Sequence, residues 1–137
     1  MKVLIDTNII LDVLLKRAPF YEDGICIMKM GDKIEKFISA SAVTDIYYIA
    51  NRNLKDKAVV KKLLQNLLKI VSVATVSEKE IQYALELEWS DFEDSVQYAV
   101  AQIQDMDGVI TRNADDYSHS EIPVWLPGEF LKKYQIS

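Results

Sequence analysis

The first fifteen residues constrain the fold more than any other stretch of this 137-residue chain. A short apolar run at residues 3–5 stops at Asp6, and apolar side chains then recur at helical spacing over residues 9–14. This pattern predicts a buried strand that feeds directly into a helix, with Thr7 and Asn8 as the capping residues. Asp6 would then stand at the carboxyl end of the strand, where open α/β sheets bind their ligands.

The same alternation of strand and helix continues along the chain. Further apolar runs predict strands at 37–40, 70–73 and 108–111 and a short edge strand at 122–125. Helical patterns fill the intervals at 20–30, 41–50, 52–69, 77–87 and 90–103, and a closing helix follows at 128–134. The S-x-x-E patterns Ser77–Glu80 and Ser90–Glu93 predict capping boxes at the starts of the helices over 77–87 and 90–103. Helices between successive strands imply parallel pairing, so we predict a single domain over residues 1–137. Its fold class is α/β, a three-layer α/β/α sandwich with a twisted, mainly parallel sheet of four to five strands.

The charge of the chain is unevenly distributed. The formal net charge is −5, which argues against a protein that binds nucleic acid by bulk charge. Residues 52–69 nevertheless carry a net charge of +5, which leaves −10 for the remainder. This basic segment is either a solvated helix face or a binding surface for a polyanion. In the second case its contact residues would be Arg52, Lys55, Lys57, Lys61 and Lys62, joined by Arg112.

The sequence also predicts the compartment. Cys26 is the only cysteine and lies in an apolar stretch, so we expect a buried thiol in a reducing environment. Asp6 and Asn8 interrupt the first apolar residues, which excludes the pattern of a signal peptide or a membrane span. We therefore expect a cytoplasmic protein that does not associate with membranes.

Aspartates follow several of the predicted strands. Because parallel strands end at one edge of the sheet, residues just beyond each strand converge in space. This rule gathers Asp6, Asp45, Asp91 and Asp94 together with the neighbouring pair at residues 115–116. Each has a simpler explanation when taken alone, because an aspartate early in a helix stabilises the dipole and one in a polar loop forms a turn. Asp6 is the exception, since it lies between two apolar runs and needs a binding partner.

Clustered carboxylates repel one another and require a counter-charge. Arg112 is near enough in sequence to reach them, but no other basic motif accompanies them. A hard divalent cation, Mg²⁺ or Mn²⁺, binds carboxylate oxygens while retaining several waters. Such an ion activates water and stabilises a transferring phosphoryl group, so the cluster predicts metal-assisted phosphodiester hydrolysis.

Four segments, taken in order, resemble a known family. Residues 3–8 (VLIDTN), 38–48, 91–94 (DFED) and 110–117 have the sequence and spacing of a bacterial PIN domain, closest to the small VapC-like branch. The resemblance extends from about residue 2 to residue 131. It implies the three-layer fold predicted above and a metal-dependent ribonuclease site built from three or four acidic residues.

The resemblance also implies a role for each residue. Asp6, Asp45 and Asp94 match the first three acidic positions, and the fourth falls on either Asn113 or Asp116, of which Asp116 is the better match. Asp45 stands where glutamate is common, which favours coordination through water there. Auxiliary roles fall on the remaining polar residues of the motifs, Thr7, Asn8, Asp91, Thr111 and Asn113.

The leading functional hypothesis is therefore a Mg²⁺- or Mn²⁺-dependent endoribonuclease that cleaves single-stranded RNA, with single-stranded or structured RNA as its binding partner. The resemblance adds the toxin role of a type II toxin–antitoxin pair, with a cognate antitoxin and a homodimeric assembly. The alternative is a catalytically weak or inactive PIN-like module that binds RNA or protein, which Asp45 and Asn113 would explain. A phosphoacceptor receiver domain is disfavoured because residues 122–127 lack the required lysine. The aromatic side chains Tyr47, Tyr48, Trp89 and Trp125 are expected in the core rather than in an interface.

Overall fold

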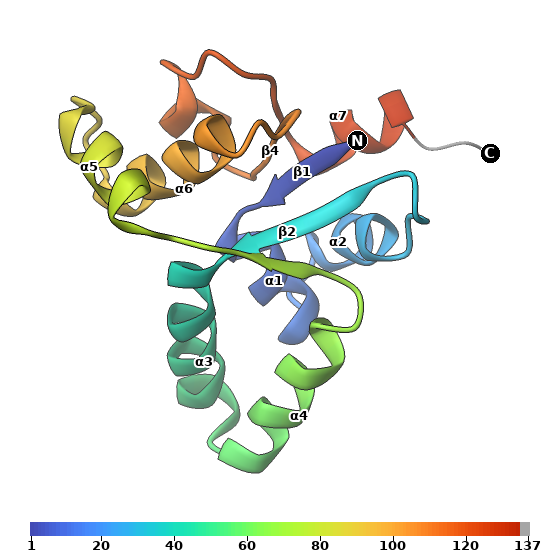
Figure 1. The fold of residues 1–137 in the computed structure, drawn as a ribbon. Helices are drawn as coiled ribbons and strands as arrows, with labels where there is room; N and C mark the ends of the chain where they lie inside the picture. The colour runs from blue at the N-terminus through green and yellow to red at the C-terminus, as the bar shows by residue number, and fades with distance from the viewer. Residues whose placement is uncertain (135–137) are drawn as a thin grey trace.

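A five-stranded sheet lies between two layers of helices (Figure 1). The structure is a computed structural model that describes residues 1–134. The strands are β1 (Lys2–Ile5), β2 (Glu35–Ser39), β3 (Ser72–Ala74), β4 (Gly108–Ile110) and β5 (Val124–Trp125). They run in the order β3-β2-β1-β4-β5, and each neighbouring pair is parallel. The predicted α/β/α class with a parallel sheet is confirmed.

The helices divide between the two faces of the sheet. They are α1 (Thr7–Leu14), α2 (Tyr21–Met28), α3 (Ala40–Leu54), α4 (Lys57–Leu67), α5 (Glu78–Glu86), α6 (Phe92–Ile103) and α7 (Pro127–Tyr134). Because successive residues of a strand point to opposite faces, Val3 and Ile5 of β1 join the core beneath α1–α4 and α7. Leu4 points the other way, into the core beneath α6. The central strand thus contributes to both hydrophobic layers.

The order of the strands places a switch point between β1 and β4. After β1 the chain builds outward through β2 to β3 on one side, and then returns to place β4 on the other side of β1. In doubly wound sheets the ligand crevice forms outside the carboxyl ends of the strands at such a switch. Asp6 follows β1 and Thr111 follows β4, and the Asp6 backbone N–H donates to the Ile110 carbonyl at 2.9 Å. Both residues therefore lie at the crevice.

Two helix starts differ from the predictions. Asp6, rather than Thr7 or Asn8, caps α1, because its extended backbone lets its own side chain accept from the Thr7 N–H. Ser39 caps α3 by accepting from the Ala42 N–H, so this helix begins earlier than the sequence pattern indicated. Asp45 consequently lies in the second turn of α3, not in the first. A favourable interaction with the helix dipole no longer explains it.

The basic segment is not one long helix. The chain turns sharply between α3 and α4, where Lys55 adopts a left-handed conformation with φ of 53°. Asp56 then caps α4 by accepting from the Val59 N–H at 3.2 Å. The prediction of one helix over residues 52–69 is therefore wrong, and Arg52 lies on a different helix from the lysines of α4.

Three further predictions about single residues are wrong. Asp91 caps α6 instead of Ser90, because its carboxylate accepts from the Asp94 N–H at 3.1 Å. Cys26 is exposed, since α2 turns Gly24, Ile27 and Met28 inward instead. Tyr48 is 65% exposed rather than part of the core.

Other details agree with the sequence patterns. The capping box formed by Ser77 and Glu80 at the start of α5 is confirmed, as is the burial of Trp125. None of the helices among residues 1–134 combines the length and apolar character that crossing a membrane requires.

Candidate active site

An acidic cavity of about 500 Å³ opens at the switch point of the sheet. Six acidic side chains line it: Asp6, Asp45, Asp91, Glu93, Asp94 and Asp116. The structure thus brings together the four candidate metal ligands of the sequence analysis and the auxiliary Asp91. Thr7, Asn8 and Asn113 line the same cavity. We refer to this space as the acidic cavity.

Asp6 lines the acidic cavity and is only 4% exposed. Its Oδ1 accepts hydrogen bonds from the Thr7 backbone N–H at 2.8 Å and from Gln97 Nε2 at 2.7 Å. Its Oδ2 accepts from Thr111 Oγ1 at 2.7 Å. Three donors therefore compensate for the removal of this carboxylate from water and fix its orientation.

Thr111 links Asp6 to the loop that follows β4. Its side chain is fully buried, and its Oγ1 both donates to Asp6 and accepts from the Asn113 backbone N–H at 3.0 Å. This loop continues into a short 3₁₀ helix, Ala114–Tyr117, which carries Asp116. The auxiliary role predicted for Thr111 thus has a geometric basis, because it connects the first acidic residue to the segment that carries the last.

The acidic cavity carries an excess of negative charge. Burial, followed by the charges of Asp6, Asp91 and Asp116, raises the pKa of Asp94 to about 7. Burial and the adjacent Asp45 likewise raise the pKa of Glu93. Two carboxyl groups therefore hold their protons more tightly than usual, which is what unneutralised neighbours produce.

Two residues of the site were missed in the sequence. The sequence pattern assigns Glu93 to a capping box with Ser90, whereas the cap in the structure is Asp91 and Glu93 borders the cavity beside Asp45. Gln97 is 4% exposed and follows Asp94 by three residues, the spacing that puts two side chains on one helix face. That spacing was a signal in the sequence from which its position could have been predicted.

The donors of the acidic cavity suit a hard cation. Within residues 1–134, no three aspartate, glutamate, histidine or cysteine side chains lie close enough together to bind one metal ion jointly. Mg²⁺ nevertheless binds through one or two carboxylates and keeps several waters, and a cavity of about 500 Å³ has room for them. The oxygen-only donor set and the raised pKa of Asp94 are both consistent with a site for such an ion.

The basic residues are arranged differently from the prediction. Arg52 lines the acidic cavity, but Lys55, Lys57, Lys61 and Lys62 do not. Arg112 points away to Asp12, with its Nε 2.7 Å from Oδ2, and its guanidinium lies 4.0 Å from the centre of the Phe20 ring. Arg112 therefore does not neutralise the acidic cavity. The reason is that Asp12 is 1% exposed and needs this partner.

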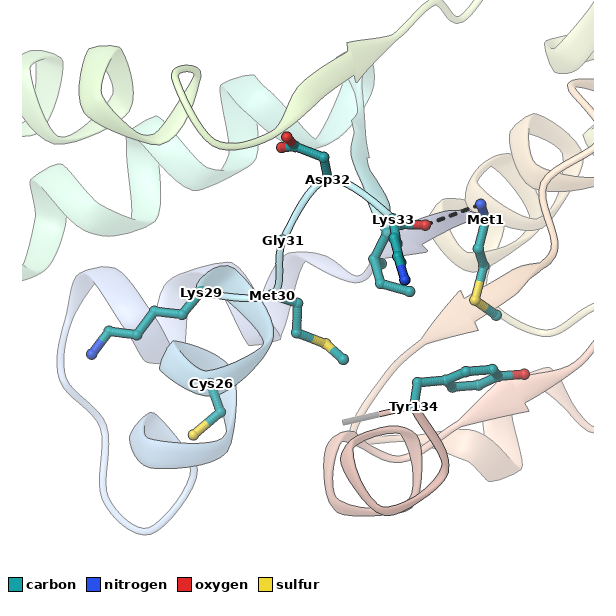
Figure 2. A pocket seen from close by; sticks show the side chains of 9 residues that line it. Met1, Cys26, Lys29, Met30, Gly31, Asp32, Lys33 and Tyr134 are labelled. Carbon is teal, nitrogen blue, oxygen red and sulfur yellow. Dashed lines mark hydrogen bonds between the residues drawn. The ribbon is translucent and has the colours of Figure 1, made fainter. Parts of the chain in front are cut away.

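A second, larger cavity of about 890 Å³ lies elsewhere, between the loop before β2 and the end of α7 (Figure 2). Figure 2 shows Met30 and Cys26 on one side of it and Tyr134 on the other. Its lining includes a single acidic residue, Asp32. It offers no group of acidic or nucleophilic side chains comparable to the acidic cavity.

The fold and the site together define a doubly wound α/β protein with an acidic cavity at the switch point of its sheet. The chain belongs to the PIN domain family, whose model matches residues 2–115. No curated protein matches the sequence.

Solved structures share this fold. A toxin–antitoxin complex from Klebsiella pneumoniae aligns with a TM-score of 0.68 at 20% identity, covering 91% of this chain and 97% of the other. VapBC-1 from nontypeable Haemophilus influenzae aligns with a TM-score of 0.72 at 14% identity, covering 93% and 99%. VapC20 from Mycobacterium tuberculosis, a toxin that cleaves the sarcin–ricin loop, aligns with a TM-score of 0.64 at 14% identity, covering 78% and 86%. At these identities the similarity shows the fold alone.

Proposed function

We propose that this chain is a Mg²⁺- or Mn²⁺-dependent endoribonuclease that hydrolyses single-stranded RNA, and that it is the toxin of a type II toxin–antitoxin pair. The observation that carries the proposal is the acidic cavity, where Asp6 is held by three donors among five further carboxylates. Membership of the PIN family and the toxin–antitoxin proteins among the structural neighbours support it.

The residues of the acidic cavity would have different roles in the reaction. Asp6 and Asp94 would hold the cation, and Asp116 and Asp45 line the same cavity. A bound Mg²⁺ or Mn²⁺ would supply Lewis acidity and would lower the pKa of the water that serves as the nucleophile. Asn8 and Asn113 present neutral polar groups at the same cavity, where they can orient that water or the phosphate oxygens. The pKa of Asp94 is about 7, so a cation bound there would displace the proton that this carboxyl group holds below that pH.

The partners follow from the same proposal. RNA would be the substrate, a cognate antitoxin would cover the toxin, and the toxin would form a homodimer. The structural neighbours solved as toxin–antitoxin complexes support the antitoxin.

The test is cleavage of single-stranded RNA in Mg²⁺ or Mn²⁺, repeated in EDTA and with the Asp6→Asn variant. We expect cleavage with either metal and none in the other two conditions. Asp32→Asn is a matched control, because Asp32 borders the second cavity instead. Cleavage that survives Asp6→Asn would refute the mechanism.

A binding module without catalysis is the second candidate. It is favoured by the absence of a closed coordination shell within the described residues and by Asp45, whose short side chain reaches less far than glutamate. Calorimetric titration with Mn²⁺ separates the candidates. Binding that is lost in both Asp6→Asn and Asp94→Asn supports the nuclease, and no Mn²⁺ binding by the unmodified protein supports the module.

A further inference from the structure

One face of α3 extends the acidic cavity outward. Asp45, Tyr48, Ile49 and Arg52 all line the cavity and are separated by three, four and seven residues. This spacing places them in one stripe along a helix. The stripe passes from an acid at the proposed cleavage site to an aromatic ring and then to a guanidinium, over a length of about 10 Å.

Tyr48 is not used to build the core. It is 65% exposed, and its ring meets the neighbouring Tyr47 edge to face, with 5.4 Å between the ring centres. This contact restrains the ring while most of its surface remains open at the cavity. A tyrosine placed in this way offers an aromatic surface to a ligand without having to reorganise the protein.

Arg52 remains available for a ligand despite its acidic surroundings. The two ion pairs formed within residues 1–134 both involve Asp12, and Arg52 takes part in neither. The Arg52 side chain lines the acidic cavity. The guanidinium therefore lies at the acidic cavity, and its N–H groups form no ion pair with a carboxylate among residues 1–134.

We propose that Tyr48 and Arg52 form a subsite for one unpaired nucleotide of single-stranded RNA adjacent to the scissile phosphate. The base stacks on the Tyr48 ring, and Arg52 binds the neighbouring phosphate. The inference rests on the proposed function for its substrate class. The cavity otherwise repels a polyanion, so a single arginine at its edge determines where the backbone enters.

The subsite restricts the substrate to unpaired strands. An aromatic side chain can stack on a base only when that base is free of its neighbours in a helix. Such stacking is tolerant of sequence because every base has a π-face. Tyr48 therefore selects single-stranded over double-stranded RNA and does not select a particular base.

The test measures RNA binding rather than cleavage. A fluorescently labelled single-stranded oligoribonucleotide is titrated in EDTA at low salt and followed by anisotropy. We expect Tyr48→Ala to weaken binding roughly ten-fold and Tyr48→Phe to preserve it. Leu85→Ala is the matched control, because Leu85 is 67% exposed and does not line the cavity. Unchanged binding in Tyr48→Ala would overturn the proposal.

Arg52 is tested in the same assay. We expect Arg52→Ala to weaken binding and to lower the slope of log affinity against log salt by about one. Lys132→Ala removes one exposed charge on α7 and should leave the slope unchanged. If the salt slope falls equally in Arg52→Ala and Lys132→Ala, Arg52 acts only through the net charge of the protein. That result would overturn the assignment of Arg52 to the subsite.

The outcomes for the subsite and for the nuclease are separate. Binding that depends on Tyr48 without metal-dependent cleavage retains the subsite and rejects the nuclease. If cleavage depends on Asp6 but RNA binding is the same in Tyr48→Ala and the unmodified protein, the nuclease is retained and the subsite is rejected. A duplex of the same sequence should bind more weakly, and equally well in the unmodified protein and Tyr48→Ala. Duplex binding that depends on Tyr48 would contradict base stacking.

Discussion

Gln97 donates a hydrogen bond from Nε2 to Oδ1 of Asp6 at 2.7 Å, and both side chains are 4% exposed. The bond joins α6 to the end of β1 across 91 residues of sequence. Gln97 Oε1 is buried and has no hydrogen-bond partner within the described residues. Gln97 therefore acts on Asp6 as a positioning residue, in the way that groups behind a metal ligand set its orientation.

Replacing Gln97 by leucine should weaken metal binding while retaining the fold. The substitution keeps the volume approximately but removes the donor to Asp6 Oδ1, so we expect Mn²⁺ affinity to fall roughly 10- to 100-fold in calorimetry. Gln82→Leu on the exposed face of α5 is the control and should leave the affinity unchanged. Equal Mn²⁺ affinity in Gln97→Leu and the unmodified protein would show that Asp6 needs no such support.

Asp94 should make the metal-free fold less stable as the pH rises. Its pKa is about 7 in the folded protein and near 3.8 when unfolded, so the folded state binds more protons between these values. The free energy of unfolding should therefore fall from about pH 4 to about pH 7 and then level off, by roughly 2 kcal/mol after allowance for solvent screening.

Denaturant unfolding in EDTA across this range measures the effect. Asp94→Asn should flatten the profile and be more stable than the unmodified protein above pH 7. Asp107→Asn, on the exposed loop before β4, should retain the dependence. A profile that is equally steep in Asp94→Asn would assign the titration to another group.

The sequence was sufficient to locate the acidic cavity because two rules act together. The apolar periods of residues 3–5 and 108–110 are strong local signals, and parallel pairing brings the ends of those strands together regardless of loop detail. Asp6, Asp45, Asp94 and Asp116 were placed in this way, and the cavity contains all of them.

Predictions were wrong where they depended on the rotation of a helix about its axis or on a partner far away in the sequence. Each residue turns a helix by about 100°, so an error in the start of α6 reassigned Glu93 from the cavity to a cap. Arg112 is held by Asp12, 100 positions earlier in the chain, and no local sequence pattern indicates that pairing. Tyr48 is hydrophobic in composition but lies at the cavity, which only the tertiary structure shows.

Gly108 should not tolerate a side chain. A Cβ there would lie 2.4 Å from Trp125 Cζ3 and 2.6 Å from the Pro123 carbonyl oxygen, between β4 and β5. The carbonyl cannot retreat without breaking its 3.0 Å hydrogen bond from the Val109 N–H. We expect Gly108→Ala to lower the free energy of unfolding by about 3 kcal/mol in urea. Gly31→Ala is the control because nothing lies within 4 Å of its Cβ, and a comparable loss there would remove the steric explanation.

Asp12 should be the most sensitive charged residue outside the acidic cavity. It is 1% exposed, burial raises its pKa, and Arg112 opposes that rise through an ion pair of 2.7 Å. Asp12→Ala would leave the partly buried guanidinium of Arg112 without its partner, so we expect a loss of about 3 kcal/mol in urea unfolding. Arg17 approaches Asp12 only to 3.8 Å and is more exposed, so Arg17→Ala should cost less than about 1 kcal/mol.

Asp12 should also affect metal binding through Arg112, which lies between Thr111 and Asn113. Asp12→Ala should loosen the loop that supports Asp6. Mn²⁺ affinity should therefore fall in Asp12→Ala but not in Arg17→Ala.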